Sequence, residues 1–299
     1  MGVDIVRYSD FVIYDKDMKL VELPRDIFDY GTRGETITIE NAGQSVETER
    51  VGDRTHIREI QVEERSIELT IQIFGKTRHD YEIKERKLFR FFRDLGAFYV
   101  SKGTAPNILY KVIHNGKIGI DKVNYIVPYA LATVSLLKVD IDYGVSKFTT
   151  LDLHNRKVKF DGKWALGMNL EGIASGKNTK YIFKHDEPIH FFNASDVPFK
   201  NISNPFFKVR IKVKSNVSKI TLYDDYGNTF IYNNKQNVSD NLKNGDVLEI
   251  RGVNIELNKK NVLSKTNKRF LKTKTGINKW RILEDFNYEI EFDFRYIYE

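Results

Sequence analysis

The sequence predicts a mainly β protein of two domains, and three observations support this. Runs of alternating apolar and polar residues recur along the whole chain, and a single segment has the spacing of an amphipathic helix. In the second half, turn signals recur often enough to indicate a β-sandwich. Residues 1–147 hold 22 Lys and Arg against 23 Asp and Glu, whereas residues 148–299 hold 26 against 18. This asymmetry favours two domains, 1–147 and 148–299.

The first half is expected to consist mostly of strands. Its clearest strand is Ser66–Ile73, in which the Ile and Leu side chains share one face and the polar ones the other, as in a half-buried antiparallel strand. The polar segment Gln44–His56 is expected to be a long exposed excursion. Further strands are expected at Phe11–Tyr14, Thr36–Glu40, Phe98–Val100, Ile108–Ile113, Lys122–Ile126 and Ala132–Tyr143.

One helix is predicted in the first half, Asp80–Leu95. Thr77 and Asp80 have the spacing of a capping box at its start, and Gly96 is expected to end it. The helix has a stripe of mostly aromatic residues. Such a stripe could line a ligand groove, but we adopt the interpretation that it is buried against a sheet. The stripe consists of Tyr81, Leu88, Phe91, Phe92 and Leu95.

The second half is expected to contain short strands and no helix. Asp224–Asn228 has the composition of a hairpin turn, and Asn244-Gly245-Asp246 is a bend before a strand rather than a phosphate loop, because strand-like residues follow it. The predicted strands are Ile182–Phe183, His190–Asn193, Phe207–Val213, Ile220–Tyr223, Thr229–Tyr232, Val247–Ile250, Val253–Leu257 and Tyr288–Tyr298.

The composition excludes several classes of protein. Cysteine is absent, so disulfides and thiolate metal sites are excluded. No apolar run approaches the length of a membrane span or a classical signal, so we expect a soluble protein that stays in the cytoplasm or is released by lysis. The Asn-x-Ser triplets at Asn193, Asn201, Asn216 and Asn237 are then chance products of an Asn-rich chain.

A search for catalytic and metal-binding motifs finds none in a suitable context, so no enzyme activity, cofactor or metal is expected. Ser135 and Lys138 have the Ser-x-x-Lys spacing, but they lie in an apolar strand, whereas that nucleophile needs a helix start. His185, Glu187 and His190 form the best metal candidate, and Pro188 interrupts the strand that would align them, so a surface loop is the preferred interpretation.

Two further features leave alternatives open. Trp164 and Trp280 could be sugar-stacking platforms on a sandwich, although Trp is more often a core residue. Lys259–Arg281 contains nine basic residues and no acidic one. We prefer a solvated loop or a protein contact over nucleic acid for this segment, because it has few interleaved aromatic residues. The candidate partner-contact residues are Lys259, Lys260, Lys265, Lys268, Arg269, Lys272 and Lys274.

The whole pattern resembles the distal tail protein of long non-contractile-tailed phages. The C-terminal half carries Gly245-Asp246 followed by Val247–Ile250, then Arg269-Phe270-Leu271 and Gly276-Ile277-Asn278. The N-terminal half has Gly52-Asp53-Arg54 in a long loop, the strand Ser66–Ile73 and the helix Asp80–Leu95. The resemblance covers nearly the whole chain, and its motifs are structural.

The resemblance implies an N-terminal β-sandwich that assembles as a hexameric ring at the tail end, and a second, galectin-like sandwich that projects outward. The implied function is that of a hub between the tail tube and the tail-tip or receptor-binding components, in the virion tail. The expected partners are copies of this chain, the tail tube protein, a tail-tip protein, and a receptor-binding protein or host glycan, with no membrane. Two alternatives stay open: a carbohydrate-binding module or glycan-active enzyme, and a nucleic-acid-binding protein using residues 259–281.

Overall fold

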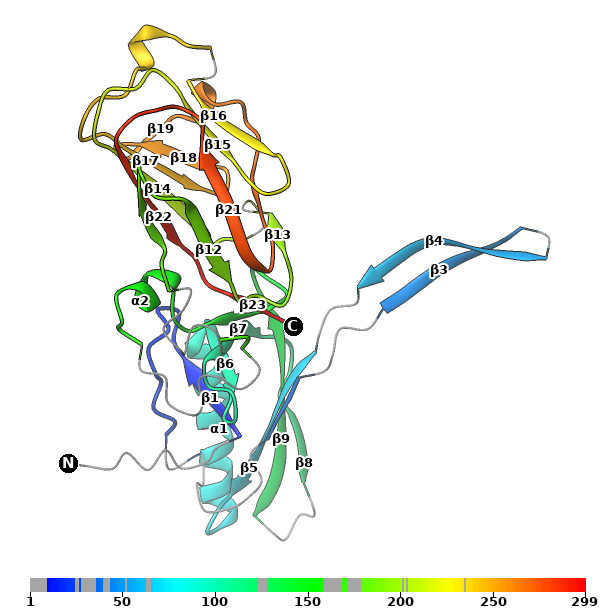
Figure 1. Ribbon diagram of the computed structural model, residues 1–299. Coiled ribbons are helices and arrows are strands. Elements are labelled where there is room, and N and C mark those ends of the chain that lie inside the picture. Colours follow the sequence, from blue (N-terminus) through cyan, green and yellow to red (C-terminus); the bar gives the residue numbers. More distant parts are fainter. Residues whose placement is uncertain are drawn as a thin grey trace. The chain divides into compact units, whose positions relative to one another are not determined.

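The computed structural model describes residues 10–24, 27, 36–39, 44–51, 53–62, 66–122, 128–158, 168–170, 179–200, 202, 204–233 and 235–299. Within them the protein is mainly β, with several antiparallel sheets and few helices, as predicted (Figure 1). The chain forms two compact units, Met1–Asp142 and Tyr143–Glu299. The division lies a few residues before the predicted position 147/148, because β10 (Gly144–Ser146) pairs with β23 (Ile297–Tyr298) in the second unit.

The first unit is built on one antiparallel sheet, with the strand order β1-β6-β7-β9-β5-β2 and β8 paired to β9. The alternation that the sequence shows in β5 becomes an alternation of buried and more exposed side chains. The strands are β1 (Phe11–Tyr14), β2 (Thr36–Ile39), β5 (Ile67–Phe74), β6 (Ala97–Lys102), β7 (Ile108–His114), β8 (Gly119–Lys122) and β9 (Tyr129–Lys138).

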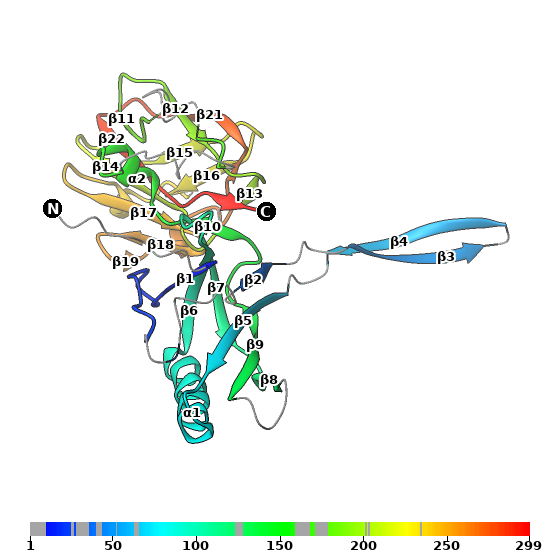
Figure 2. The ribbon, with the colours of Figure 1, turned by 90° about the horizontal axis from the view of Figure 1, so that it is seen from below.

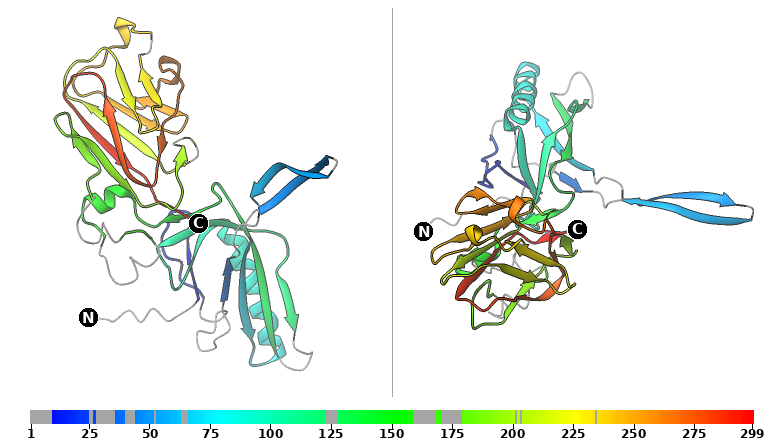
Figure 3. Two further views of the ribbon diagram at one scale, coloured as in Figure 1. Left: turned by 45° about the vertical axis from the view of Figure 1, so that its right-hand side comes forward. Right: turned by 90° about the horizontal axis from the view of Figure 1, so that it is seen from above.

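Helix α1 (Arg78–Leu95) lies alongside this sheet (Figure 3). The predicted capping box is confirmed only in its Thr77 half: Thr77 Oγ1 accepts a hydrogen bond from Asp80 N at 3.2 Å, whereas the Asp80 carboxylate accepts from Lys76 N at 2.7 Å instead of from Thr77 N. The helix begins at Arg78, two residues before the predicted start, and Gly96, with φ 61°, ends it as predicted. Tyr81, Leu88 and Phe92 are buried in one core with the inward side chains of the sheet. The sequence predicts a sandwich here, whereas in the described part of the unit this helix, rather than a second sheet, packs on the core.

One strand prediction in the first unit falls outside the described residues and another differs from the structure. Of the strand predicted at Lys122–Ile126, only Lys122, the last residue of β8, is described, so this prediction stays untested. The strand predicted at Ala132–Tyr143 ends at Lys138. Asp140 has a positive φ of 68°, which turns the chain out of the sheet.

The predicted polar excursion is a β-hairpin. Its strands β3 (Gln44–Val51) and β4 (Arg54–Val62) pair with each other in a two-stranded sheet of their own and run side by side (Figure 2). We call Gln44–Val62 the arm.

The second unit contains two larger antiparallel sheets, with the orders β11-β22-β14-β17-β18-β19 and β12-β21-β15-β16, and a small pair β13-β20. Their strands are β11 (Ile182–Lys184), β12 (Ile189–Asn193), β13 (Phe199–Lys200), β14 (Lys208–Val213), β15 (Ile220–Tyr223), β16 (Thr229–Tyr232), β17 (Val247–Arg251), β18 (Asn254–Leu257), β19 (Lys260–Asn261), β20 (Lys272–Thr273), β21 (Gly276–Ile282) and β22 (Tyr288–Asp293).

An aromatic layer joins the two larger sheets face to face. Phe191 of β12 stacks on Phe292 of β22 with ring centroids 4.2 Å apart, and Trp280 of β21 lies 5.3 Å from Phe292. Trp280 is 3% exposed, so it is a core residue, as preferred from the sequence. Trp164 lies outside the described residues. The described helices span too few apolar residues to cross a membrane.

The Asn-Gly-Asp stretch is a bend between strands. Gly245 has a φ of 95°, which favours glycine, and its N–H donates to Val213 O at 2.9 Å. Asp246 accepts hydrogen bonds from Lys243 N at 2.7 Å and from Asn258 Nδ2 at 2.8 Å. The aspartate therefore stabilises the turn, and no helix N-terminus follows it.

The second unit departs from the sequence prediction at its two ends. A short helix, α2 (Thr150–His154), was not expected, although Thr149 and Asp152 form a full capping box at its start. The predicted strand Tyr288–Tyr298 is interrupted after Asp293, because Phe294 N donates to Thr150 Oγ1 at 3.0 Å. In the same way Tyr296 N donates to Ser146 Oγ at 3.0 Å.

The independence of the two units stays a prediction. Limited proteolysis is expected to cut first between about residues 140 and 165 and to leave two folded fragments, because linkers between compact units are preferred cleavage sites. Mass spectrometry and circular dichroism of the fragments would show this. Cleavage chiefly inside 66–140 without a stable fragment would contradict it.

Candidate functional site

The side chains considered as catalytic or metal-binding candidates in the sequence make structural hydrogen bonds and ion pairs instead. Ser135 Oγ donates to Glu68 Oε1 on the neighbouring strand at 3.2 Å. Because Ser135 lies in the strand β9, it is not at the start of a helix, as a Ser-x-x-Lys nucleophile would be. His185 Nε2 lies 3.0 Å from Asp285 Oδ1, and Glu187 pairs with Lys180 at 2.8 Å. Among the described residues, no three His, Asp or Glu side chains converge as a metal would require.

The arm has two chemically different faces. Thr48 lies opposite Ile57 and Glu49 opposite His56, so Val46, Thr48 and Ile57 share one face, which also carries Arg50 at its end. Val46 is 47% and Ile57 63% exposed. The opposite face carries charge, including the ion pair Arg58–Glu49 at 2.9 Å.

An isolated two-stranded hairpin is at best marginally stable in water. The exposed apolar face of the arm is therefore suited to packing on another surface, and covering it would remove apolar area from water.

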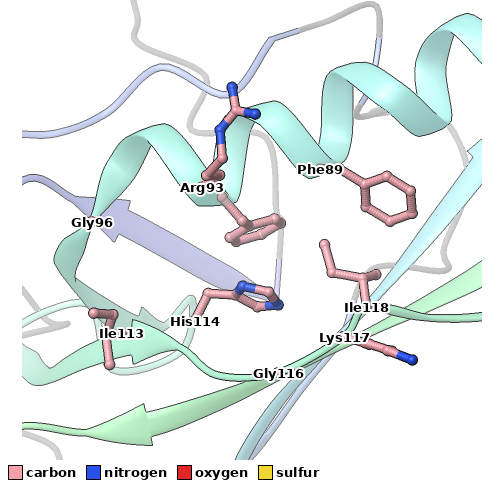
Figure 4. Close-up of a pocket in the computed structure, with 9 residues that line it drawn as sticks. Phe89, Arg93, Gly96, Ile113, His114, Gly116, Lys117 and Ile118 are labelled. Carbon is pink, nitrogen blue, oxygen red and sulfur yellow. The ribbon is translucent and has the colours of Figure 1, made fainter.

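A hollow of about 620 Å³ lies between α1 and the segment that joins β7 to β8 (Figure 4). Phe89, Phe92 and Ile118 supply its apolar surface, while Arg93, His114 and Lys117 supply nitrogen atoms, and none of the described lining residues is a carboxylate. The full set of lining residues is Phe89, Phe92, Arg93, Gly96, Ile113, His114, Gly116, Lys117 and Ile118.

The hollow is suited to an apolar side chain of a partner. His114 Nε2 is buried and makes no hydrogen bond within the described residues, and its ring lies 6.4 Å from that of Phe92. The sequence prediction missed this hollow. Phe89, 38% exposed on the helix, is the signal that could have indicated it, because a large aromatic residue off the buried stripe needs an explanation.

Ion pairs cover the outer face of the six-stranded sheet. Arg210 pairs with Glu249 at 3.2 Å and with Glu291 at 3.3 Å, so β14 is linked to both of its neighbours. Lys214 and Lys212 donate to Glu289 and hold the pKa of its carboxyl below the usual range. The basic and acidic side chains of these three strands therefore satisfy one another, and this face offers little unpaired charge.

The structure distributes the seven candidate partner-contact residues over different places. Lys265 pairs with Asp240 at 2.6 Å, which lowers the pKa of that carboxyl, and Lys274 pairs with Asp225 at 3.0 Å. The Lys272 Nζ lies 5.7 Å from the ring centre of Tyr226. The others, Lys259, Lys260, Lys268 and Arg269, are exposed, the first two beside the turn from β18 to β19. Their role in binding a partner stays a prediction.

Reversing three of the exposed lysines is expected to leave the fold intact. The triple variant Lys259→Glu, Lys260→Glu, Lys268→Glu should change the free energy of unfolding by less than about 0.5 kcal/mol, as for ordinary surface substitutions. Lys265→Glu is the matched comparison and should destabilise more, since it places a second carboxylate beside Asp240. A loss above about 1 kcal/mol in the triple variant, measured by denaturant unfolding, would show that these lysines are structural.

Comparison with known families bears on the part of the chain that holds the arm, α1 and the hollow. Residues 34–137 match the model of the phage tail protein RIFT-related domain. The matched segment lies within the first unit, and its similarity is to a phage tail protein domain. The comparison with curated proteins gives no significant match.

Solved structures extend the similarity to most of the chain. The Dit (gp 19.1) protein of phage SPP1 aligns with a TM-score of 0.58 and 9% identity, over 88% of this chain and 94% of that one. The fold is therefore Dit-like, in agreement with the resemblance seen in the sequence. Chains of the phage p2 baseplate in its activated conformation align over 95% and 96% of this chain at 11% identity, with TM-scores of 0.38 and 0.40.

Proposed function

We propose that this protein is the distal tail protein of a phage, a structural hub that joins the tail tube to the tail-tip and receptor-binding components. One observation carries the proposal: a phage tail domain at residues 34–137 lies within a chain whose fold is that of SPP1 Dit. SPP1 Dit is described as a paradigm of the hub adsorption apparatus in phages that infect Gram-positive bacteria. The protein would be located at the virion tail tip and would act without catalysis or a cofactor.

The first unit is the proposed ring-forming part, with six copies as the number that the family resemblance implies. The apolar face of the arm, with Val46 and Ile57 exposed, provides a surface that a neighbouring copy can cover. The hollow beside α1 provides a recess on the same unit. A head-to-tail contact of this kind closes into a ring when its rotation permits.

The second unit is proposed to be a galectin-like sandwich that presents its faces to other tail components. Its two sheets and the aromatic layer between them support this assignment. The tail tube protein and a tail-tip protein are the proposed partners of the ring, and a receptor-binding protein or host glycan that of the second unit.

The two alternative functions have less support. Trp280 is buried between the sheets and is not accessible as a sugar-stacking platform. The basic segment has Lys265 and Lys274 engaged in ion pairs, so it does not present one continuous charged surface to nucleic acid.

Solution mass combined with negative-stain imaging tests the proposal. The protein at tens of micromolar is expected to give closed rings with an open centre and a mass of about six chains. A monomer under these conditions would count heavily against a tail hub. A reducing-sugar assay and a DNA-binding assay at two salt concentrations would detect the alternatives.

A further inference from the structure

The outer face of the four-stranded sheet carries an uncommon mixture of side chains. Along β21 and just after it, Ile277, Lys279, Arg281 and Leu283 alternate with inward-facing residues such as the buried Trp280. Ile277 is 49% and Leu283 60% exposed. Two cations therefore lie between two exposed apolar side chains on one strand.

Two tyrosines hold cations in place on this side of the unit. The Arg281 guanidinium lies 4.8 Å from the ring centre of Tyr223, which is its cross-strand partner. The Lys272 Nζ lies 5.7 Å from the ring centre of Tyr226, a residue that is 52% exposed. These cation–π contacts limit the freedom of the two charges before any partner arrives. We call Tyr223, Tyr226, Lys272, Ile277, Lys279, Arg281 and Leu283 the cationic face.

The acidic side chains beside the cationic face already make hydrogen bonds or ion pairs with other groups. Asp225 Oδ2 accepts a hydrogen bond from Lys279 N at 2.9 Å and pairs with Lys274 at 3.0 Å. Glu284 accepts from the Thr221 backbone N and from its Oγ1, at 2.5 and 2.7 Å. Among the described residues, no ion pair neutralises Lys272, Lys279 or Arg281. The face is therefore positively charged.

We propose that the cationic face is a docking surface for a protein partner whose own surface alternates acidic and apolar side chains. The inference rests on the proposed function, since the partner would be another tail component. Charge complementarity requires acidic groups opposite Lys279 and Arg281, and the exposed Ile277 and Leu283 require apolar groups beside them. Tyr and Arg are also the residue types enriched where binding energy concentrates in protein interfaces.

A polyanionic chain fits this face less well than a protein does. Nucleic acids and sugars gain much of their affinity by stacking on free aromatic rings. Here Tyr223 and Tyr226 each already carry a cation against the ring. Ile277 and Leu283 would stay exposed beneath a polymer of phosphates, whereas a protein can cover them.

Peptide binding to the full-length protein tests the proposal. The probe is a fluorescent peptide of alternating Glu and Leu, compared with an alternating Lys and Leu peptide and with single-stranded oligothymidylate of equal negative charge, by anisotropy. We expect the Glu-Leu peptide to bind at least tenfold more tightly than either comparison. The variant Lys279→Glu, Arg281→Glu should lose at least tenfold in affinity for it.

Two control variants make the outcome specific. The variant Lys259→Glu, Lys260→Glu changes the same basic segment, but beside the six-stranded sheet. Its affinity for the Glu-Leu peptide should stay within twofold of that of the unaltered protein. The variant Ile277→Ser, Leu283→Ser keeps all charges, and its affinity for the Glu-Leu peptide should still fall severalfold. Equal affinity for oligothymidylate, or equal losses in both charge-reversed variants, would overturn the proposal. The mass of the same samples reports ring formation separately, so failure here is distinguishable from failure of the hub function.

Discussion

Deleting Ser45–Thr55 is expected to convert the assembled protein into monomers that remain folded. The deletion removes most of the arm, including Val46 on its apolar face and Glu47 and Glu49 on its other face. The strands of the main sheet and helix α1 stay intact, because within the described residues β3 and β4 pair only with each other. The proposed ring should therefore lose a contact between copies, while the core of the first unit keeps its packing.

Light scattering measures the expected change, a fall in mass from about six chains to one, and circular dichroism verifies the fold. Val46→Ser with Ile57→Ser should weaken assembly in the same direction. Val253→Ser is the matched control, since this residue is 55% exposed at a turn of the second unit and should leave the mass unchanged. Rings that persist after the deletion would remove the arm from the assembly contact.

Phe292→Ala is expected to destabilise the second unit by about 3–5 kcal/mol, the usual cost of removing a buried phenylalanine ring. Phe292 is fully buried on β22 and stacks on Phe191 across the two sheets. It also meets Trp280 edge to face at 5.3 Å. The substitution leaves a cavity in the layer that joins the sheets, and the surrounding rings can fill it only in part.

Denaturant unfolding monitored by Trp fluorescence measures this loss, because Trp280 lies beside the cavity. Phe89→Ala in the first unit is the control and should cost less than the buried ring, since Phe89 is 38% exposed. Its unfolding is followed by circular dichroism, because both tryptophans lie in the second unit. A loss below about 1 kcal/mol for Phe292→Ala would mean that the aromatic layer does not carry the stability of this unit.

Local patterns were sufficient to predict the elements that bury one face. The alternation in Ile67–Phe74 and the stripe of Tyr81, Leu88 and Phe92 predict a strand and a helix, because burial requires those periods. The bend at Gly245 was predictable for a different local reason, because glycine readily adopts the positive φ that this turn requires.

Contacts between distant residues could not be predicted. The chain leaves the sheet after Asp293 because Thr150 and Ser146, far away in the sequence, accept the N–H groups of Phe294 and Tyr296. The alternation of apolar and polar residues in that segment does not indicate these hydrogen-bond partners.

The surfaces were predictable only in part. The exposed polar segment was expected, but its pairing into an arm was not, because few of its residues alternate between apolar and polar. The basic segment was recognised as a charge excess. Its division between paired lysines and the cationic face depends on Asp240, Asp225 and the two tyrosines, which fold next to it from elsewhere in the chain.

The pairing of β10 with β23 has a consequence for biosynthesis. Gly144 lies opposite Tyr298, so the second unit cannot close until the ribosome has translated almost to residue 299, whereas the first unit is complete at Asp142. At about 5–20 residues per second, the interval lasts on the order of ten to thirty seconds. If the first unit folds by itself, as predicted, first units on neighbouring ribosomes of one messenger RNA can meet during that time, and the proposed ring contacts can start to form on nascent chains.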